Sequence, residues 1–372
     1  MNAGKSSKCY CSALAIWTFF DIVTNYSFLG LTFLAYMRYV ALGIAALLIC
    51  FSIMRQRFSY LQLFGLSVLF LMVVLVSYFS RTEALIVVVL FAITAREVNV
   101  RSLGRAVFAA TLLAALVVLV ACLLGFIPDS LSFRGGVERH ALGFKHPNML
   151  GGVLVASAIA LFVWKWGERR RRYYLYVVVL AVFLEVVANA RSSVVILVLL
   201  LAFLVADYLR PGFFAHKGFC WVIVIAAVIS VLLAVVYDSG NSVMRTVDLA
   251  LSERLYYSNV YYRLYGFSLL GQEMNSAAMM IGDVYAGALD NAYVHMAVEL
   301  GILPLILFVS VMAVSTRRLA VCGESGMVCA CVLFALFGLS ETYLYVLSFN
   351  FTIVACSVAI YGSSALSSKN EG

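Results

Sequence analysis

The stretch GRAVFAATLLAALVVLVACLLGF, residues 104–126, carries a single charged side chain, Arg105, among almost uninterrupted apolar residues. A helix needs about 20 predominantly apolar residues to cross the hydrocarbon core of a bilayer, so this stretch predicts a membrane-spanning helix. The whole chain has the same character, because 64% of its 372 residues are hydrophobic and 12% are charged. Soluble domains carry about 25% charged residues. This composition excludes a soluble enzyme, a secreted disulfide scaffold, a disordered chain and a nucleic-acid-binding module.

Similar apolar runs recur along the sequence and predict an all-α polytopic integral membrane protein with about 12 transmembrane helices. The period-two alternation of a membrane β-barrel is absent from the sequence. Residues 1–372 form one transmembrane domain in this interpretation, and only two connections are long: outer loop one (127–147) and outer loop two (238–287). The predicted spans are approximately 11–30, 36–54, 59–79, 83–95, 104–126, 148–165, 173–190, 193–209, 219–237, 288–314, 326–340 and 343–361.

The distribution of basic residues orients the spans. With the N-terminus in the cytoplasm, 17 of the 26 Lys and Arg residues lie on the inner side, as the positive-inside rule requires. This arrangement also accounts for the formal charge of +8, and the run Arg169–Arg172 is its strongest anchor. Both termini are then cytoplasmic, and both long loops are extracytoplasmic. The nine cysteines form no metal-binding pattern, so we expect neither a metal site nor disulfides.

Outer loop one concentrates charge on the side of the membrane where basic residues are otherwise scarce. Its cations and histidines are Arg134, Arg139, His140, Lys145 and His146. Guanidinium groups bind phosphate oxygens through paired hydrogen bonds, so this loop indicates a phosphate ligand. The alternative is a solvated loop whose charges have no ligand. Pro147 and Asn148 then begin a span, and proline suits the first helical turn.

The outer corner at residues 189–193 has almost no loop, which places Arg191 at the membrane boundary. Glu185 lies within the preceding span, where an ionisable side chain usually faces a cavity or a partner. Two interpretations follow: Glu185 and Arg191 form a structural ion pair, or Glu185 orients Arg191 into a substrate cavity. Asp21 and Asn25, near the outer end of the first span, permit the same two interpretations.

Outer loop two contains a predicted amphipathic helix over residues 252–265, lying on the membrane surface. Arg254 and Arg263 occur in it together with five tyrosines. These tyrosines either form an interfacial aromatic belt or provide a flat platform for sugar rings.

At the end of this loop, Asp290 and Asn291 begin the tenth span, where an acidic residue either caps the helix or serves the chemistry. Tyr293 follows them. His295 lies about 7 Å deeper, on a different face from Asp290, and is expected to be a packed histidine. Pro304 is expected to kink the span.

With these residues the chain resembles the Wzy-type polysaccharide polymerases of the O-antigen polymerase and ligase superfamily. The resemblance extends over about residues 130–310. Glu253 stands where the family pattern S-G-R-L has glycine, and Asp290 stands where ligases of the superfamily typically have histidine, which favours a polymerase. The similar segments are Gly143-Phe144-Lys145-His146-Pro147-Asn148, Ala190-Arg191-Ser192-Ser193, Ser252-Glu253-Arg254-Leu255, Tyr265-Gly266-Phe267-Ser268-Leu269-Leu270-Gly271-Gln272, and Asp290-Asn291-Ala292-Tyr293 leading into Glu299-Leu300-Gly301-Ile302.

The resemblance implies a GT-C-like glycosyltransferase in the bacterial plasma membrane. It would polymerise undecaprenyl-diphosphate-linked oligosaccharide repeat units on the outer face, with inversion at the anomeric carbon and without a metal or other cofactor. Its expected partners are lipid-linked glycans, membrane lipid, a flippase and a chain-length regulator. Two alternatives stay open: a ligase-like transfer to another acceptor, and a transporter of lipid-linked oligosaccharide.

Breaking a glycosyl–diphosphate bond builds negative charge on the leaving group, which fixed arginines stabilise. We therefore assign the diphosphate to Arg191 and Arg254, assisted by Arg134, Arg139 or Arg263. An attacking hydroxyl needs a general base, for which Asp290 is the first candidate, followed by His140, His146 and Glu185. The expected substrate-binding residues are Arg134, Arg139, His140, His146, Asn148, Glu185, Arg263, Asn291 and Tyr293.

Overall fold

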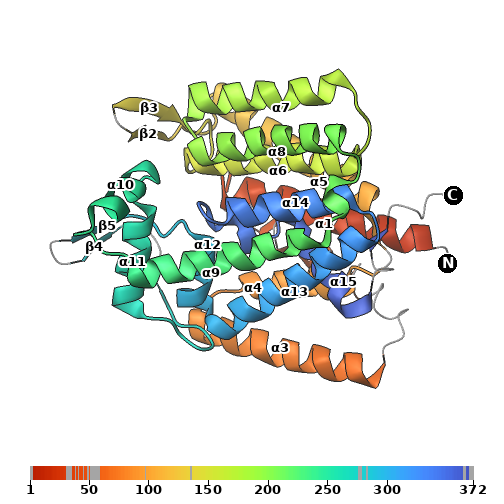
Figure 1. Cartoon of the computed structure of the whole chain (residues 1–372). Coiled ribbons are helices and arrows are strands. Elements are labelled where there is room, and N and C mark those ends of the chain that lie inside the picture. Colours follow the sequence, from red (N-terminus) through yellow and green to blue (C-terminus); the bar gives the residue numbers. More distant parts are fainter. Residues whose placement is uncertain are drawn as a thin grey trace.

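The computed structural model describes residues 3–30, 59–96, 98–134, 136–274, 279–281, 284–362 and 366–367, together with isolated residues between 36 and 50. Its long helices lie approximately side by side in one bundle (Figure 1). The principal helices are α1 (Ala3–Asn25), α3 (Tyr60–Ser80), α4 (Ala84–Thr94), α5 (Val100–Leu123), α6 (Pro147–Trp164), α7 (Arg171–Phe183), α8 (Arg191–Leu209), α9 (Cys220–Val236), α13 (Ile302–Val321), α14 (Ser325–Phe337) and α15 (Cys356–Tyr361).

Six helical segments of the described chain are long and apolar enough to cross a membrane. They lie at 62–80, 100–123, 147–164, 191–209, 217–236 and 302–321, and three shorter apolar helices lie at 84–94, 325–337 and 351–361. The expectation of a helical membrane protein is therefore confirmed at this level. The count of twelve spans stays a prediction, and nearly half of the expected span 36–54, including all of 51–54, lies outside the described residues.

Two expected spans differ from the structure. The span expected at 288–314 is broken at Gly301 rather than kinked at Pro304: α12 (Ala292–His295) and the π-helix η4 (Met296–Leu300) precede Gly301, and α13 follows it. Gly301 has φ +103°, and Pro304 lies within the first turn of α13, where proline is accommodated. The continuous helix expected at 343–361 is also wrong. That segment contains the 3₁₀ turns η5 (Thr342–Tyr345) and η6 (Phe351–Ala355) before α15.

The helix α6 forms the centre of the bundle. Almost all of its side chains are buried, which explains why its sequence is apolar on every side. It packs against α5 at Gly104, where a Cβ atom would lie 2.7 Å from the backbone nitrogen of Trp164. Only glycine allows the two backbones to approach so closely. The helix α5 also packs along α1.

The two predicted outer loops lie together at one end of the bundle (Figure 1). Loop one folds as an antiparallel hairpin of β2 (Leu131–Arg134) and β3 (Val137–His140). Loop two contains α10 (Ser242–Ala250), α11 (Arg254–Tyr265) and a second hairpin of β4 (Met279–Ile281) and β5 (Val284–Ala286). The helix expected at 252–265 is present as α11, while its position on a membrane surface stays a prediction.

The opposite end of the bundle holds the start of α1 (Figure 1). There, β1 (Val98–Asn99) pairs in parallel with β6 (Leu366–Ser367). The loops therefore lie at the end of the bundle opposite the β1–β6 pair, while the orientation of the bundle in a membrane stays a prediction.

Candidate functional site

The candidate site centres on Arg254, the first residue of α11. Its Nη2 atom donates to Glu341 Oε1 at 3.0 Å and lies 3.5 Å from Asp290 Oδ2. The Asp290 side chain keeps 35% of its surface exposed, whereas Glu341 keeps 4%. One guanidinium is therefore held between an accessible carboxylate and a buried one.

Glu341 was missed by the sequence analysis, although it connects three parts of the chain. Its Oε1 atom accepts hydrogen bonds from Ser192 Oγ at 2.6 Å and Asn148 Nδ2 at 3.0 Å, as well as from Arg254. Burial and the nearby charge of Asp290 raise the pKa of Glu341 above its usual range, although Arg254 opposes this shift. The sequence does contain one signal for Glu341: it is an acidic residue at a short outer corner between two predicted spans.

Asp290 and Asn291 have different tasks. The Asn291 side chain caps α12 by accepting from the backbone nitrogens of Tyr293 at 3.0 Å and Val294 at 3.1 Å. Asp290 therefore has no capping role and faces Arg254. Burial raises the pKa of Asp290 despite the opposing positive charges of Arg254 and Arg134. A higher pKa makes this carboxylate a stronger base once it is ionised.

Arg139 anchors the loop-one hairpin instead of projecting freely. It is 3% exposed, and its guanidinium donates to the backbone oxygen of Ala188 at 3.0 Å and to Asn148 Oδ1 at 2.6 Å. Burial and the charge of Arg134 lower the pKa of Arg139 to about 10, so it stays charged at neutral pH. Asn148 thus joins Arg139 to Glu341 and fixes the base of the site.

Arg134 and Arg191 complete the positive cluster. Burial and the nearby charges of Arg254 and Arg191 lower the pKa of Arg134, so these three cations lie within electrostatic reach of one another. Arg191 is exposed at the first position of α8, whose start has no side-chain cap. A helix N-terminus favours negative charge, so α8 and its arginine favour an anion at the same place.

A buried carboxylate in loop two fixes the start of α11, the helix that carries Arg254. Asp248 on α10 accepts from the backbone nitrogens of Leu255 at 2.8 Å and Tyr256 at 3.1 Å, and thereby caps α11. Nothing in the local sequence marks Asp248, because a cap supplied by a neighbouring helix has no local spacing pattern. Just before Arg254, Glu253 adopts φ +62°, a left-handed conformation that favours glycine.

Three predicted residues lie apart from the cluster or are tied to their own surroundings. Glu185 is exposed on the π-helix η1 (Leu184–Ala188) and forms no ion pair within the described parts of the chain. Arg263 lines a separate pocket of about 270 Å³ between α11 and the segment that follows α9. His140 Nδ1 lies 2.7 Å from Asp129 Oδ2 within loop one.

Three further residues have structural partners. His146 Nδ1 accepts from the backbone nitrogen of Asn148 at 3.2 Å, and burial lowers the pKa of His146 to about 4. Tyr293 is fully buried and donates to the backbone oxygen of Ala335 at 2.8 Å. His295 is also buried, as expected for a packed histidine, and contacts Tyr345 Oη at 2.7 Å.

The cluster has unused capacity for an anion. Arg254 contacts both carboxylates, and Arg134 and Arg191 lie near enough to influence its surroundings electrostatically. The Nε atom of Arg254 is buried and has no hydrogen-bond partner among the described residues. A buried, unpaired donor is costly, and an oxygen of a bound ligand would satisfy it.

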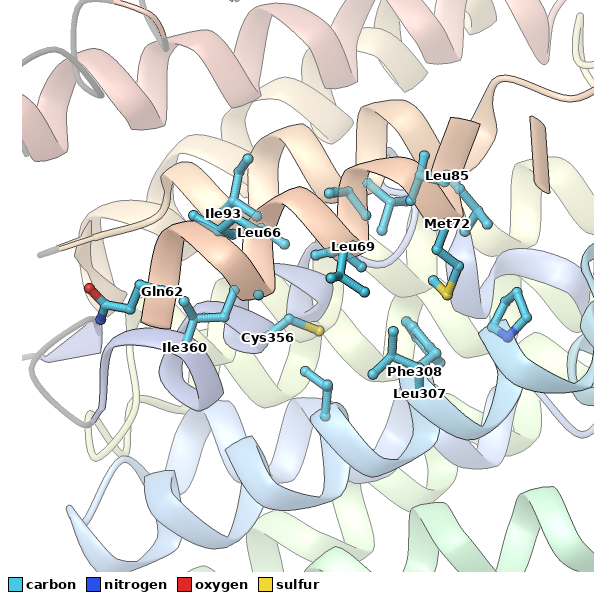
Figure 2. Close-up of a pocket in the computed structure, with 18 residues that line it drawn as sticks. Gln62, Leu66, Leu69, Met72, Leu85, Ile93, Leu307, Phe308, Cys356 and Ile360 are labelled. Atoms are coloured by element: carbon cyan, nitrogen blue, oxygen red, sulfur yellow. The ribbon is translucent and has the colours of Figure 1, made fainter. Parts of the chain in front are cut away.

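An apolar groove lies elsewhere in the bundle, between α3, α4, α13 and α15. It has a volume of about 500 Å³ and is lined by aliphatic and aromatic side chains, among them Leu69, Met72, Leu85 and Phe308 (Figure 2). Its lining runs along several turns of α3, from Gln62 to Val73. A groove of this shape and polarity suits a hydrocarbon chain.

No protein-family model, curated protein or solved structure compared with this chain matches it. Within the described ranges, no group of three or more His, Cys, Asp and Glu side chains is placed to hold a metal ion. The geometry and chemistry of the arginine–carboxylate cluster are therefore the basis for its function.

Proposed function

We propose that this protein is a membrane glycosyltransferase that polymerises lipid-diphosphate-linked oligosaccharide repeat units. The observation that carries the proposal is Arg254 held between Asp290 at 3.5 Å and Glu341 at 3.0 Å, at the loop-bearing end of a membrane-type helix bundle. Arg134 and Arg191 lie within electrostatic reach of this contact. Several fixed cations beside one accessible carboxylate suit a reaction that has a diphosphate leaving group and a hydroxyl nucleophile.

In the proposed reaction, an acceptor sugar hydroxyl attacks the anomeric carbon of the growing glycan. A new carbon–oxygen bond forms, and the bond to the lipid diphosphate breaks with its electron pair on the departing phosphate oxygen. The hydroxyl proton passes to Asp290, whose raised pKa suits a base. Arg191 and Arg254 bind the diphosphate, and direct displacement inverts the anomeric configuration.

Glu341 is the positioning residue of this mechanism. It is buried, holds Arg254 at 3.0 Å and is itself held by Ser192 and Asn148. A pre-positioned guanidinium stabilises developing negative charge without reorganising during the reaction. Arg139 keeps a structural task, because its hydrogen bonds fix Asn148 and the hairpin.

Two further observations support the proposal. The apolar groove between α3 and α13 offers space for part of an isoprenoid chain (Figure 2). Glu253 has a left-handed backbone conformation, which favours glycine, and the polymerases that this chain resembles carry glycine at this position. On the basis of the resemblance, we also propose that the protein lies in the bacterial plasma membrane and that its site is extracytoplasmic. Its proposed partners are a flippase and a chain-length regulator.

The test is reconstitution of the purified protein in liposomes with undecaprenyl-diphosphate-linked repeat units from its native host. A polysaccharide ladder on a gel, formed without nucleotide sugars, is the expected result. Arg254→Ala should reduce ladder formation by about 100-fold or more, the scale expected for loss of a transition-state donor. Arg245→Ala is the matched control, since Arg245 is an exposed arginine of the same loop that lies 3.7 Å from Glu253 and also interacts with Tyr237, and it contacts neither Asp290 nor Glu341 among the described ion pairs.

Two results would overturn polymerisation. Transfer of single glycans to a different added acceptor, without a ladder, would assign the chain to ligase-like transfer. Movement of intact lipid-linked units across the liposome bilayer, without transfer, would assign it to transport. Full activity of the Arg254→Ala variant would remove the proposed role of Arg254 in binding the diphosphate.

A further inference from the structure

A second groove lies between α1 and α5 and is unrelated to the arginine cluster. Its volume is about 670 Å³. Lys8 and Arg105 contribute cationic side chains to its lining, and Phe19, Phe20 and Leu113 are among the apolar residues that line the remainder. The groove is therefore amphipathic, with charge contributed by both helices.

The two cations lie at the same end of the groove. Each follows the first residue of its helix by five positions, so each lies about 8 Å from its helix start. The starts of α1 and α5 are adjacent, because Ser7 Oγ accepts from the backbone nitrogen of Asn99 at 3.0 Å. Lys8 and Arg105 therefore lie near the end of the bundle where the chain begins.

The apolar part of the groove is about as long as the hydrocarbon region of one bilayer leaflet is thick. From Lys8 to Phe20 the rise along α1 is about 18 Å, and from Arg105 to Leu113 along α5 it is about 12 Å. Half of a bilayer hydrocarbon core is about 15 Å. A single acyl chain fits along such a groove with its headgroup at the cations.

We propose that the α1–α5 groove binds an anionic phospholipid from the leaflet at the chain-terminal end of the bundle. Lys8 and Arg105 bind the headgroup phosphate, and one acyl chain lies along the residues that lead to Leu113. The Arg105 guanidinium lies 5.6 Å from the ring centroid of Trp164, a cation–π contact that orients it. Basic pockets between membrane helices are established binding sites for anionic headgroups.

Charge complementarity selects this lipid over others. A zwitterionic phospholipid offers the same acyl chain, but its headgroup carries no net negative charge for the two cations. A second copy of the chain would need an acidic patch opposite Lys8 and Arg105. The inference does not depend on the proposed glycosyltransferase activity, because the groove and the arginine cluster share no residue.

The test is native mass spectrometry of the full chain released from membranes that contain equal amounts of phosphatidylglycerol and phosphatidylcholine. Wild-type protein should retain phosphatidylglycerol preferentially. Lys8→Gln combined with Arg105→Gln should reduce this preference at least tenfold, since each membrane-surface cation contributes about a fivefold effect. The double variant Arg171→Gln and Arg210→Gln is the control, because it removes two exposed cations that do not line the groove.

A second variant separates a groove from a general attraction of lipid to positive charge. Ala109 is exposed and lines the groove, so Ala109→Phe fills it while both cations remain. Phosphatidylglycerol retention should fall in this variant as well. Unchanged retention in Ala109→Phe, equal loss in the control pair, or a protein dimer in place of bound lipid would overturn the proposal.

Discussion

At the scale of single residues, one carboxylate oxygen joins three helical segments. Glu341 Oε1 accepts from Asn148 on α6, Ser192 on α8 and Arg254 on α11. A buried charge of this kind is stable only while its partners remain. Glu341 is therefore more important for the placement of Arg254 than for contact with a substrate.

Replacing Glu341 tests this positioning role. Glu341→Gln keeps the size of the side chain but removes its charge, so Arg254 is expected to interact more strongly with Asp290. The pKa of Asp290 should fall, and the acidic limb of the rate–pH profile should move to lower pH. Polymerisation at neutral pH should decrease about tenfold through loss of positioning. An unchanged profile would show that Glu341 does not influence Asp290.

Replacing Asp290 tests the general base. Asp290→Asn removes the proton acceptor and should lower the polymerisation rate about 100-fold or more at neutral pH. Substrate binding, measured separately with radiolabelled lipid-linked repeat units, should be retained. Asp238→Asn is the control, because Asp238 is exposed in the same loop and its hydrogen bond to Gly240 survives as asparagine. Equal rates in both variants would exclude Asp290 as the base.

At the scale of elements, helix starts position the site. The start of α6 depends on neutral His146, which accepts the Asn148 backbone hydrogen bond. The pKa of His146 is about 4, below its ordinary value of 6.5, because of burial and the charges of Arg139 and Arg134. The stability that neutral His146 provides is present above pH 6.5 and is lost as the pH falls toward 4.

A thermal unfolding series between pH 7 and pH 4 measures this effect. The wild-type melting temperature should fall over that interval. His146→Asn should show a shallower fall, because asparagine caps helices well and does not titrate there. Identical slopes for the two proteins would contradict a contribution from His146.

Another element boundary depends on Gly301, which joins η4 to α13. A Cβ atom there would lie 2.6 Å from the backbone oxygen of Leu269, and φ is +103°. Gly301→Ala should therefore destabilise the protein by about 1–3 kcal/mol. Gly65→Ala is the matched control: Gly65 lies within α3 with open space around it, and alanine there should be neutral or slightly stabilising. Equal melting temperatures in detergent would contradict the expected strain.

At the scale of the whole molecule, the two loops and the start of α1 lie at opposite ends of the bundle (Figure 1). If the bundle spans a membrane, a membrane-impermeant maleimide added to intact cells should label Ser239→Cys in outer loop two. Native Cys322 is exposed just beyond α13 and should react only after permeabilisation. Labelling of both sites in intact cells would contradict a transmembrane arrangement.

The sequence by itself determined the helical membrane character of this protein. Apolar runs such as residues 104–126 require a membrane or a fully buried environment, and this requirement is local. It also placed Arg191, Arg254 and Asp290 at predicted outer positions, because polar groups interrupt apolar spans there. A helix at 252–265 was likewise readable from its local pattern.

Only the tertiary structure decided which of these polar residues meet. Glu341 and Asp248 act through partners far away in sequence, so no spacing pattern announces them. The break at Gly301 and the 3₁₀ turns after Glu341 also depend on packing, since apolar composition alone is equally compatible with straight helices. Hydropathy specifies where a chain enters a membrane, but long-range contacts specify which side chains share a site, because distant helices must first be brought together.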